Sequence, residues 1–457
     1  MIRRVAVIDI GKTNAKVALV DLERLSEIAL QKMANGVAGD GPYPHHPVDR
    51  LWDFVLDALA GLQRAHGVDA VSLTTHGATA ALLGADGELA LPILDYEHDG
   101  PGETRAAYEA VRPAFAETGS PPLPAGLNIG AQLFWQQRRF PERFAAATAI
   151  LMYPQYWAFR LTGVMAGEVT SLGCHTDLWN PTARDYSSMV DAMVWRGMFP
   201  ALRPASDILG AVRADVAERT NLNVATPVFC GLHDSNASLL PHLLARKAPF
   251  SVVSTGTWVV SMAVGARGVA LDPARDTLIN VNALGDPVPS ARFMGGREYE
   301  ILGGAELAQP TATDIANVFA RNVMLLPATQ QGSGPFPDSA ASWTGEPASA
   351  GERSAAIFFY LAMMTTLCLE LIGADGETIV EGPFAANAPF LDMLASATGR
   401  PVCAQSGQIT GTSIGAALLA NAARRLLDDG SQARTNPRSE WVAYAEAWRL
   451  AAEKRRR

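Results

Sequence analysis

Two short apolar strand pairs, each closed by a turn rich in glycine and hydroxyl side chains, constrain the fold of this chain most strongly. The first pair spans residues 4–21 and turns at Gly11-Lys12-Thr13-Asn14. The second spans residues 250–264 and turns at Thr255-Gly256-Thr257. Such turns present backbone N–H groups and hydroxyls to an anion, because glycine lets the backbone approach closely. The recurrence predicts two related halves that face one anionic ligand.

The length of the chain agrees with two halves. Its 457 residues are too many for one ordinary core, and no low-complexity linker divides them. A helix expected over residues 236–244 leads to a short charged segment, so we predict domains of residues 1–245 and 246–457. The order strand, strand, strand, helix, strand in residues 4–75 favours a mixed α/β fold.

Hydrophobic periodicity predicts the elements around the two turns. The expected strands are residues 4–10, 15–21, 27–34, 70–74, 228–231, 378–382 and 401–404. The expected helices are residues 48–62, 353–373, 388–398 and 411–427. A hairpin is expected to turn at residues 85–87, and residues 101–200 are expected to be helical and irregular.

Composition and charge exclude several classes of partner. The formal net charge is −9, and the one basic cluster, residues 454–457, is expected to be a frayed tail. The chain therefore lacks the grouped Lys and Arg that nucleic acid requires. The most apolar segment, residues 357–372, is too short to span a bilayer, so we expect a core helix and no membrane partner. Four scattered cysteines predict reduced thiols in a cytoplasmic protein.

Two aspartates at predicted strand ends supply groups that phosphoryl transfer requires. This reaction needs positioning, neutralised phosphate charge, a metal and a base for the acceptor hydroxyl. Asp9 ends the first strand and is suited to hold Mg²⁺ directly or through water. Asp234 follows the strand at 228–231 and is suited to accept a proton from a substrate hydroxyl. Lys12 or Lys16 would add a positive charge.

Each of these features also has an ordinary structural explanation. A D-x-G turn is common in hairpins, Asp234 could be a helix N-cap, and Lys16 could simply be solvated. The occurrence of the three features in this order favours phosphate chemistry.

From about residue 4 to about residue 427 the chain resembles the FGGY family of carbohydrate kinases, which belong to the actin-like ATPase superfamily. The similar motifs are residues 9–16 and 254–257 for phosphate, the proline-led helix 154–163 ending in Arg-Leu-Thr-Gly, the glycine-to-aspartate segment 231–237, and the adenosine-side segments 379–384 and 411–417.

The resemblance implies two RNase H-like domains that close on ATP and a sugar in the cleft between them, the first domain binding sugar and the second ATP. It implies that Asp234 is the general base and that Asp9 serves Mg²⁺. The implied nucleotide-binding residues are Gly11, Lys12, Thr13, Asn14, Lys16, Thr255, Gly256, Thr257 and Gly382. The implied sugar-binding residues are His76, Gly77, Tyr96, Asp234 and Ser235.

The chain departs from the family pattern in its phosphate and adenosine segments. Lys12 replaces the small or hydroxyl residue usual in the first turn. The usual glycine run is reduced to Glu381-Gly382-Pro383-Phe384, where Pro383 removes one backbone donor. The Thr-Asn turn and the Tyr-Pro-Gln-Tyr segment are similar to kinases of deoxyketoses such as L-fuculose or L-rhamnulose, whereas the Thr-His-Gly strand end is similar to xylulose-type kinases.

The expected function is a carbohydrate kinase, a phosphotransferase with an alcohol acceptor, that uses ATP and Mg²⁺ on a small ketose or polyol. Its expected partners are the sugar and, as one option, a second copy in a homodimer. Two alternatives stay open. An actin-like ATPase regulator would need no sugar pocket. A sugar-binding pseudokinase would explain Lys12 and the altered segment at Gly382, although the retained Asp9 and Asp234 oppose it.

Overall fold

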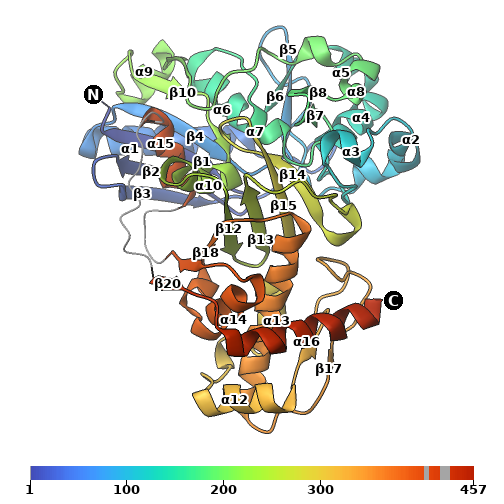
Figure 1. The fold of residues 1–457 in the computed structure, drawn as a ribbon. Coiled ribbons are helices and arrows are strands. Elements are labelled where there is room, and N and C mark those ends of the chain that lie inside the picture. The colour runs from blue at the N-terminus through green and yellow to red at the C-terminus, as the bar shows by residue number, and fades with distance from the viewer. Residues whose placement is uncertain (1, 406–410, 422–432, 457) are drawn as a thin grey trace. The chain divides into compact units, whose positions relative to one another are not determined.

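A computed structural model describes residues 2–405, 411–421 and 433–456 (Figure 1). The chain forms two compact units. Unit 1 comprises residues 1–245, 279–287 and 408–427, and unit 2 comprises residues 246–278, 288–407 and 428–457. Two segments that the sequence analysis assigned to the second domain, residues 279–287 and the described residues 411–421, therefore pack with unit 1.

Unit 1 is built on a mixed sheet with the strand order β3-β2-β1-β4-β10-β9. β1, β2 and β3 are antiparallel, while β4 and β10 run parallel to β1 and β4 respectively; β11 also pairs with β4. The strands are β1 Arg4–Ile10, β2 Asn14–Asp21, β3 Ser26–Ala34, β4 Ala70–Thr75, β9 Ile208–Ala211, β10 Pro227–Phe229 and β11 Leu232–His233.

Helices cover both faces of this sheet (Figure 1). Ala6 and Ile8 of β1 pack in one core cluster with the apolar stripe of α1 (Val48–His66). Val5 and Val7, on the opposite face, pack with α10 (Asp234–Ala245) and α15 (Thr412–Leu418). Alternate residues of a strand point to opposite faces, so a strand covered on both sides is apolar throughout.

The rest of unit 1 is mostly short helices, as expected for residues 101–200. They are α2 Arg105–Glu109, α3 Phe115–Thr118, α4 Ile129–Arg139, α5 Pro141–Ala145, α6 Tyr153–Thr162, α7 Val169–Leu172, α8 Ser188–Ala192 and α9 Ala214–Thr220. Small strands accompany them: β5 Ala80–Gly84, β6 Ala147–Met152, β7 Trp179–Asn180 and β8 Asp185–Tyr186. The 3₁₀ turns of unit 1 are Gly100–Thr104, Arg196–Met198 and Leu419–Asn421.

The second sheet has the order β14-β15-β13-β12-β18-β19-β20. Its strands are β12 Phe250–Thr255, β13 Val259–Val264, β14 Thr277–Val281, β15 Pro287–Phe293, β18 Glu377–Glu381, β19 Val402–Ala404 and β20 Ala433–Thr435. The antiparallel pair β12–β13 with β18 parallel to β12 repeats the arrangement of β1–β2 with β4. The predicted repeat of the two hairpins is therefore confirmed.

The helices of unit 2 pack around α13 (Ala350–Leu371), which is buried along most of its length. The others are α11 Gly295–Ile301, α12 Ala312–Arg321, α14 Ala388–Thr398 and α16 Ser439–Arg456, with a small β16–β17 pair at Leu325–Leu326 and Ser342–Trp343 and 3₁₀ turns at Pro273–Arg275, Gly304–Glu306 and Pro383–Ala386. Among the described residues α13 alone is long and apolar enough to cross a membrane, and 89% of its apolar window is buried, as in a core helix.

Most predicted elements are confirmed to within a few residues, but three expectations differ. The turn at residues 85–87 closes only a short hairpin, with an antiparallel bridge between Leu83 and Leu89 and the N–H of Gly84 donating to the carbonyl of Glu88 at 2.9 Å, because β5 forms its longer ladder with β6. The basic end is helical as far as it is described, because α16 continues to Arg456; Lys454 and Arg455 are exposed there, and Arg457 lies outside the described residues. The helix expected to reach residue 427 ends at Leu418, and residues 422–427 lie outside the described part of the chain.

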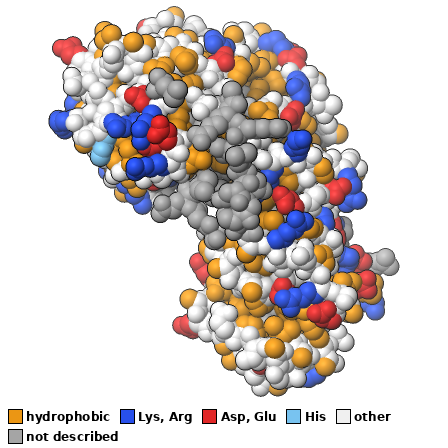
Figure 2. Space-filling view, turned by 60° about the vertical axis from the view of Figure 1, so that its left-hand side comes forward, with side chains coloured by type: hydrophobic (Ala, Val, Ile, Leu, Met, Phe, Trp, Pro, Cys, Tyr) orange, Lys and Arg blue, Asp and Glu red, His pale blue; other side chains and the backbone are white. Residues whose placement is uncertain are grey.

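Charged side chains of both signs are interspersed on the face of the molecule drawn in Figure 2. Among the side chains described there, Lys and Arg form no continuous stripe.

Candidate active site

Asp9 lies at the end of β1 in a small polar cluster. Its side chain is only 5% exposed, and Lys16, its cross-strand neighbour on β2, places Nζ 3.1 Å from Oδ2. The hydroxyl of Thr412 donates to the same oxygen, and Lys16 Nζ lies 3.2 Å from Thr412 Oγ1. Burial raises the pKa of the Asp9 carboxyl, although Lys16 opposes the shift. Lys16 is therefore a partner of Asp9 rather than a solvated side chain.

The turn between β1 and β2 directs its other lysine elsewhere. Lys12 Nζ contacts Asp95 and Glu97, which lie on either side of Tyr96, one of the expected sugar-binding residues. Gly11 donates its N–H to the carbonyl of Asn14 at 2.9 Å, which closes the turn. Thr13 is exposed at the tip of the turn, where its hydroxyl can meet a ligand.

Asp234 begins α10 directly after β11, so the strand end presents its carboxylate. Its side chain is 32% exposed, and Oδ1 accepts a hydrogen bond of 2.6 Å from the N–H of Ser235. His233 Nε2 lies 3.2 Å from the same oxygen. Desolvation raises the pKa of Asp234, while His76 opposes the shift. A carboxylate whose pKa is moved toward neutrality is suited to accept a proton.

Three buried histidines lie near this carboxylate. The ring of His76 is 5.1 Å from that of His46 and 5.4 Å from that of Tyr96. Burial lowers the pKa of all three, to about 4 for His233, so the imidazoles are neutral at pH 7. Gly77 is needed beside them, because a Cβ there would lie 2.7 Å from His233 Nε2.

The histidine rings keep hydrogen-bonding positions open. Within the described part of the chain, His76 Nε2, His233 Nδ1 and both ring nitrogens of His46 have no hydrogen-bond partner. Buried polar groups normally have partners. His76 Nδ1 donates to the carbonyl of Gly77 and His233 Nε2 faces the Asp234 carboxylate, so the remaining nitrogen of each of these two rings is an acceptor, while His46 can donate one hydrogen bond and accept another. Such nitrogens suit a ligand that carries hydroxyl groups.

Two residues that the sequence analysis did not single out fix the backbone before Asp234. The N–H of His233 donates to Thr170 Oγ1 at 2.9 Å, and that hydroxyl donates to Glu168 Oε2 at 2.5 Å. Glu168 is only 1% exposed, and burial raises the pKa of its carboxyl to about 7. Glu168 also caps α7 by accepting the N–H of Thr170, but glutamate is not a preferred N-cap residue. Neither this cap nor the contact of Thr170 with His233 is visible in the sequence.

Gln155 fixes the backbone of the turn between β10 and β11. Gln155, within the proline-led helix, donates to the carbonyls of Cys230 and Gly231 at 3.0 and 3.1 Å. Gly231 has a φ of 81°, and a Cβ there would lie 2.8 Å from the carbonyl oxygen of Leu73. The glycine-to-aspartate segment is thus held from both sides.

The second glycine turn is tied to the end of β18 within unit 2. Thr255 donates its hydroxyl to the carbonyl of Glu381 and accepts the N–H of Phe384 at 3.1 Å. Gly382 has a φ of 82°, and a Cβ there would lie 2.2 Å from the carbonyl oxygen of Thr255. Gly256 and Thr257 are exposed at the turn. Thr255 is therefore a structural anchor, and its two neighbours are the accessible part of the turn.

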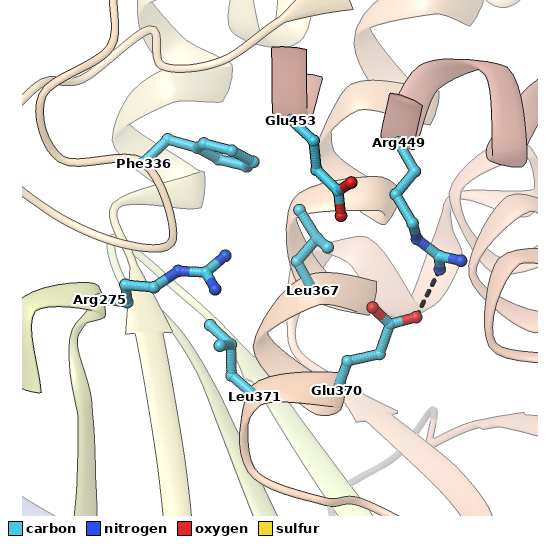
Figure 3. A pocket seen from close by; sticks show the side chains of 7 residues that line it. All are labelled: Arg275, Phe336, Leu367, Glu370, Leu371, Arg449 and Glu453. Carbon is cyan, nitrogen blue, oxygen red and sulfur yellow. Dashed lines mark hydrogen bonds and ion pairs between the residues drawn. The ribbon is translucent and has the colours of Figure 1, made fainter. Parts of the chain in front are cut away.

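The predicted residues gather in two groups, one in each unit. Unit 1 brings together residues of the first turn, the strand ends of β1, β4 and β11, and the segment 95–97. Unit 2 brings together the second turn and Gly382. A separate pocket of 460 Å³ in unit 2 contains none of the predicted site residues; its lining is Arg275, Phe336, Leu367, Glu370, Leu371, Arg449 and Glu453, with Arg449 paired to Glu370 (Figure 3).

Comparison with known proteins agrees with this arrangement. The N-terminal domain of the FGGY family of carbohydrate kinases matches residues 5–241, and the C-terminal domain described as "Carbohydrate kinase FGGY" matches residues 247–428. A carbohydrate kinase from Novosphingobium aromaticivorans, known from a crystal structure, is 36% identical, with a TM-score of 0.91 over 99% of each chain. A xylulose kinase from Rhodospirillum rubrum has the same fold, with a TM-score of 0.79 at 19% identity over 99% of this chain and 98% of its own.

Curated relatives align over shorter regions. An L-fuculokinase from Salmonella typhi is 25% identical over 269 residues, which are 56% of each protein. A xylulose kinase from Escherichia coli (strain K12) is 27% identical over 270 residues, or 54% of each. The chain thus matches about half the length of these relatives. The neighbours have the actin-like ATPase fold, which confirms the predicted fold class. The chain belongs to the FGGY family of carbohydrate kinases, whose members use ATP as the phosphate donor.

Proposed function

We propose that this chain is a kinase that transfers the γ-phosphate of ATP to a hydroxyl of a small ketose or polyol, with Asp234 as the general base. The observation that carries the proposal is the position of Asp234 at the end of β11, beside the neutral ring of His76. The Asp9 turn lies in the same unit. A base for the acceptor and groups for the phosphates are the parts that phosphoryl transfer requires.

Asp234 orients the acceptor hydroxyl and takes its proton. Ser235 N–H and His233 both contact Oδ1, which limits rotation of the carboxylate. Because the pKa of Asp234 is raised, its carboxylate is a better proton acceptor than an ordinary aspartate. Activity should fall as the pH drops toward that pKa, since the protonated acid cannot act as a base.

The histidines would recognise the sugar. His46, His76 and His233 are neutral, so His76 Nε2 and His233 Nδ1 can accept from sugar hydroxyls, and His46 can donate or accept, without a charge preference. Tyr96, whose ring lies at the edge of His76, would add an apolar surface and a hydroxyl. Gly77 and Ser235 complete the sugar-binding set that we propose.

The two glycine turns would hold the phosphates. Gly11, Thr13 and Asn14 in the first turn, and Gly256 and Thr257 in the second, offer backbone N–H groups and hydroxyls. Gly382 would lie on the nucleotide side. The positive charge of Lys16 would offset part of the negative charge of Asp9 and of the nearby phosphates.

The residues around Asp9 fit Mg²⁺ that is shared with a nucleotide. In the described ranges no group of three or more His, Cys, Asp or Glu side chains could hold a metal alone. Magnesium usually takes one or two carboxylates together with substrate phosphates and waters, and Asp9 with the Thr412 hydroxyl offers such oxygen donors. When bound, the ion neutralises phosphate charge. Asp9 would bind the ion, and the ion pair between Lys16 and Asp9 would open when the ion binds.

We also place the protein in the cytoplasm, where ATP is available. Its four buried cysteine thiols suit a reducing compartment. A homodimer, and the lack of nucleic-acid and membrane partners, stay predictions from the sequence.

A coupled ADP-release screen over ketoses, aldoses and polyols, with ATP and Mg²⁺ present, tests the proposed function. We expect a neutral ketose or polyol to raise ADP release clearly above the rate with ATP alone and to yield a phosphorylated sugar by mass spectrometry. ATP hydrolysis that no sugar accelerates would instead favour an ATPase regulator. Sugar binding without ATP binding in calorimetry would favour a pseudokinase.

A further inference from the structure

We propose that Lys12 is a positioning and specificity-determining residue for the sugar, and that with Asp95 and Glu97 it restricts the acceptor to uncharged sugars and polyols. This inference rests on the proposed kinase function and names the substrate class of the same site. The position of Lys12 in the first turn led to its assignment as a phosphate ligand, whereas here Lys12 acts on the sugar.

The contacts of Lys12 join two distant segments of unit 1. Its Nζ forms an ion pair with Asp95 Oδ1, lies 3.2 Å from Glu97 Oε2, and stands 4.5 Å from the centre of the Tyr96 ring. The Lys12 side chain is 18% exposed and that of Asp95 is 7% exposed. The ammonium is therefore held by three consecutive residues and partly withdrawn from solvent.

This cluster adjoins the groups that surround the proposed base. Tyr96 packs edge-on against His76, and His76 and Asp234 interact electrostatically. The charge of Lys12 also acts on the rings of His46 and His76. The ion-paired Lys12 therefore lies beside His46 and His76, the histidines that we propose bind the sugar.

The charges of the cluster favour an uncharged ligand. One ammonium faces two carboxylates, so the cluster remains anionic. Sugar hydroxyls can donate to the remaining carboxylate lone pairs. An aldonate or uronate would meet like charge, or would have to draw Lys12 away from Asp95. The second route leaves a buried carboxylate without its partner, which is strongly unfavourable.

The same contacts argue against Lys12 as a ligand of the nucleotide phosphates. To reach a phosphate, its ammonium would have to leave two carboxylates that already satisfy it. Lys16, which contacts only Asp9 among the nearby acidic groups of unit 1, is the lysine available for that role. The backbone N–H groups of the first turn and the Thr13 hydroxyl can still bind the phosphates when Lys12 is held by Asp95 and Glu97.

Calorimetry and steady-state kinetics with neutral and acidic sugars test the inference. Xylulose and L-fuculose serve as the neutral probes and gluconate as the acidic probe. The variants are Asp95→Asn, Lys12→Met and the charge-neutral double variant, with Lys454→Met at the exposed end of α16 as a matched control. Thermal melting of each variant reports whether it is folded, and the double variant avoids an unpaired buried carboxylate.

We expect the wild type to prefer a neutral sugar over gluconate by at least about tenfold in affinity, as like-charge repulsion produces. Asp95→Asn should narrow this preference, because it frees Lys12 to meet a carboxylate. Lys12→Met and the double variant should raise the KM for sugar and leave the KM for ATP within about twofold, while Lys454→Met should change neither constant.

Tighter binding of gluconate by the wild type, an unchanged sugar preference in Asp95→Asn, or a rise in the KM for ATP alone in the folded Lys12 variants would overturn the inference. Each of those results leaves ATP-dependent phosphoryl transfer with Asp234 as the base standing, although tighter gluconate binding would also remove the neutral acceptor from the proposal. Failure of every sugar to bind and to stimulate ADP release would overturn both.

Discussion

The hydroxyl of Thr170 links a buried carboxylate to the backbone that carries Asp234, and its removal should impair turnover more than folding. It accepts the N–H of His233 at 2.9 Å and donates to Glu168 at 2.5 Å. Valine has nearly the same shape, so Thr170→Val keeps the packing. The change leaves the buried His233 N–H without its partner and removes one of the two hydrogen bonds to Glu168 Oε2, which still accepts the N–H of residue 170 at 2.9 Å.

The expected size of the effect follows from these two bonds. A buried donor left unsatisfied costs about 1–3 kcal/mol, so we expect Thr170→Val to lower the free energy of unfolding by about 2 kcal/mol. His233 directly precedes Asp234. A displacement of the base by about 1 Å can cost about a hundredfold in rate, so kcat should fall between about tenfold and a hundredfold.

The assay is steady-state kinetics on the sugar found in the screen, together with thermal melting. Thr220→Val is the matched control, because Thr220 is equally buried and its hydroxyl donates only to Val216 within α9, at 2.7 Å. We expect the control to lose stability with kcat nearly unchanged. If Thr170→Val also keeps kcat within about twofold of the wild type, the hydroxyl does not position Asp234 and the reasoning is refuted.

Two further predictions concern a buried carboxylate in unit 1 and a glycine at the end of β18 in unit 2. Because the pKa of Glu168 is raised to about 7 in the folded state, the wild type should lose stability relative to Glu168→Gln as the pH rises from about 4.5 to about 7, by about 3 kcal/mol in denaturant titrations; a difference independent of pH would contradict this. Gly382→Ala should raise the KM for ATP and destabilise unit 2 by more than Gly399→Ala, since both have positive φ but only Gly382 would place a Cβ 2.2 Å from a backbone oxygen. Equal melting shifts in the two variants would count against a steric role for Gly382.

The strands and the acidic residues at their ends were predictable, because the information is local. The apolar run of residues 4–10 followed by a glycine turn places Asp9 at a strand end, and the same pattern places Asp234 beyond residue 229. The hairpin at residues 250–264 was predictable for the same reason. Local patterns of this kind depend only on side-chain alternation and turn chemistry.

Long-range contacts could not be predicted from the same patterns. Lys12 finds its partner 83 residues away, and no spacing rule shows which way a turn lysine points. Ser72 donates to the carbonyl of Ala416 at 2.6 Å, which joins α15 to unit 1 although it follows most of unit 2 in sequence. The pairing of β5 with β6 and the burial of α16 depend on the same kind of tertiary contact.

The most direct test of the account is the turnover of Asp234→Asn compared with that of the wild type. Asparagine keeps the size of the side chain but cannot accept the proton, so we expect kcat to fall by about three orders of magnitude or more, as general-base and positioning roles together imply. Binding of ATP in calorimetry should be unchanged. Near-normal turnover of Asp234→Asn with its best sugar would contradict the assignment of Asp234 as the base.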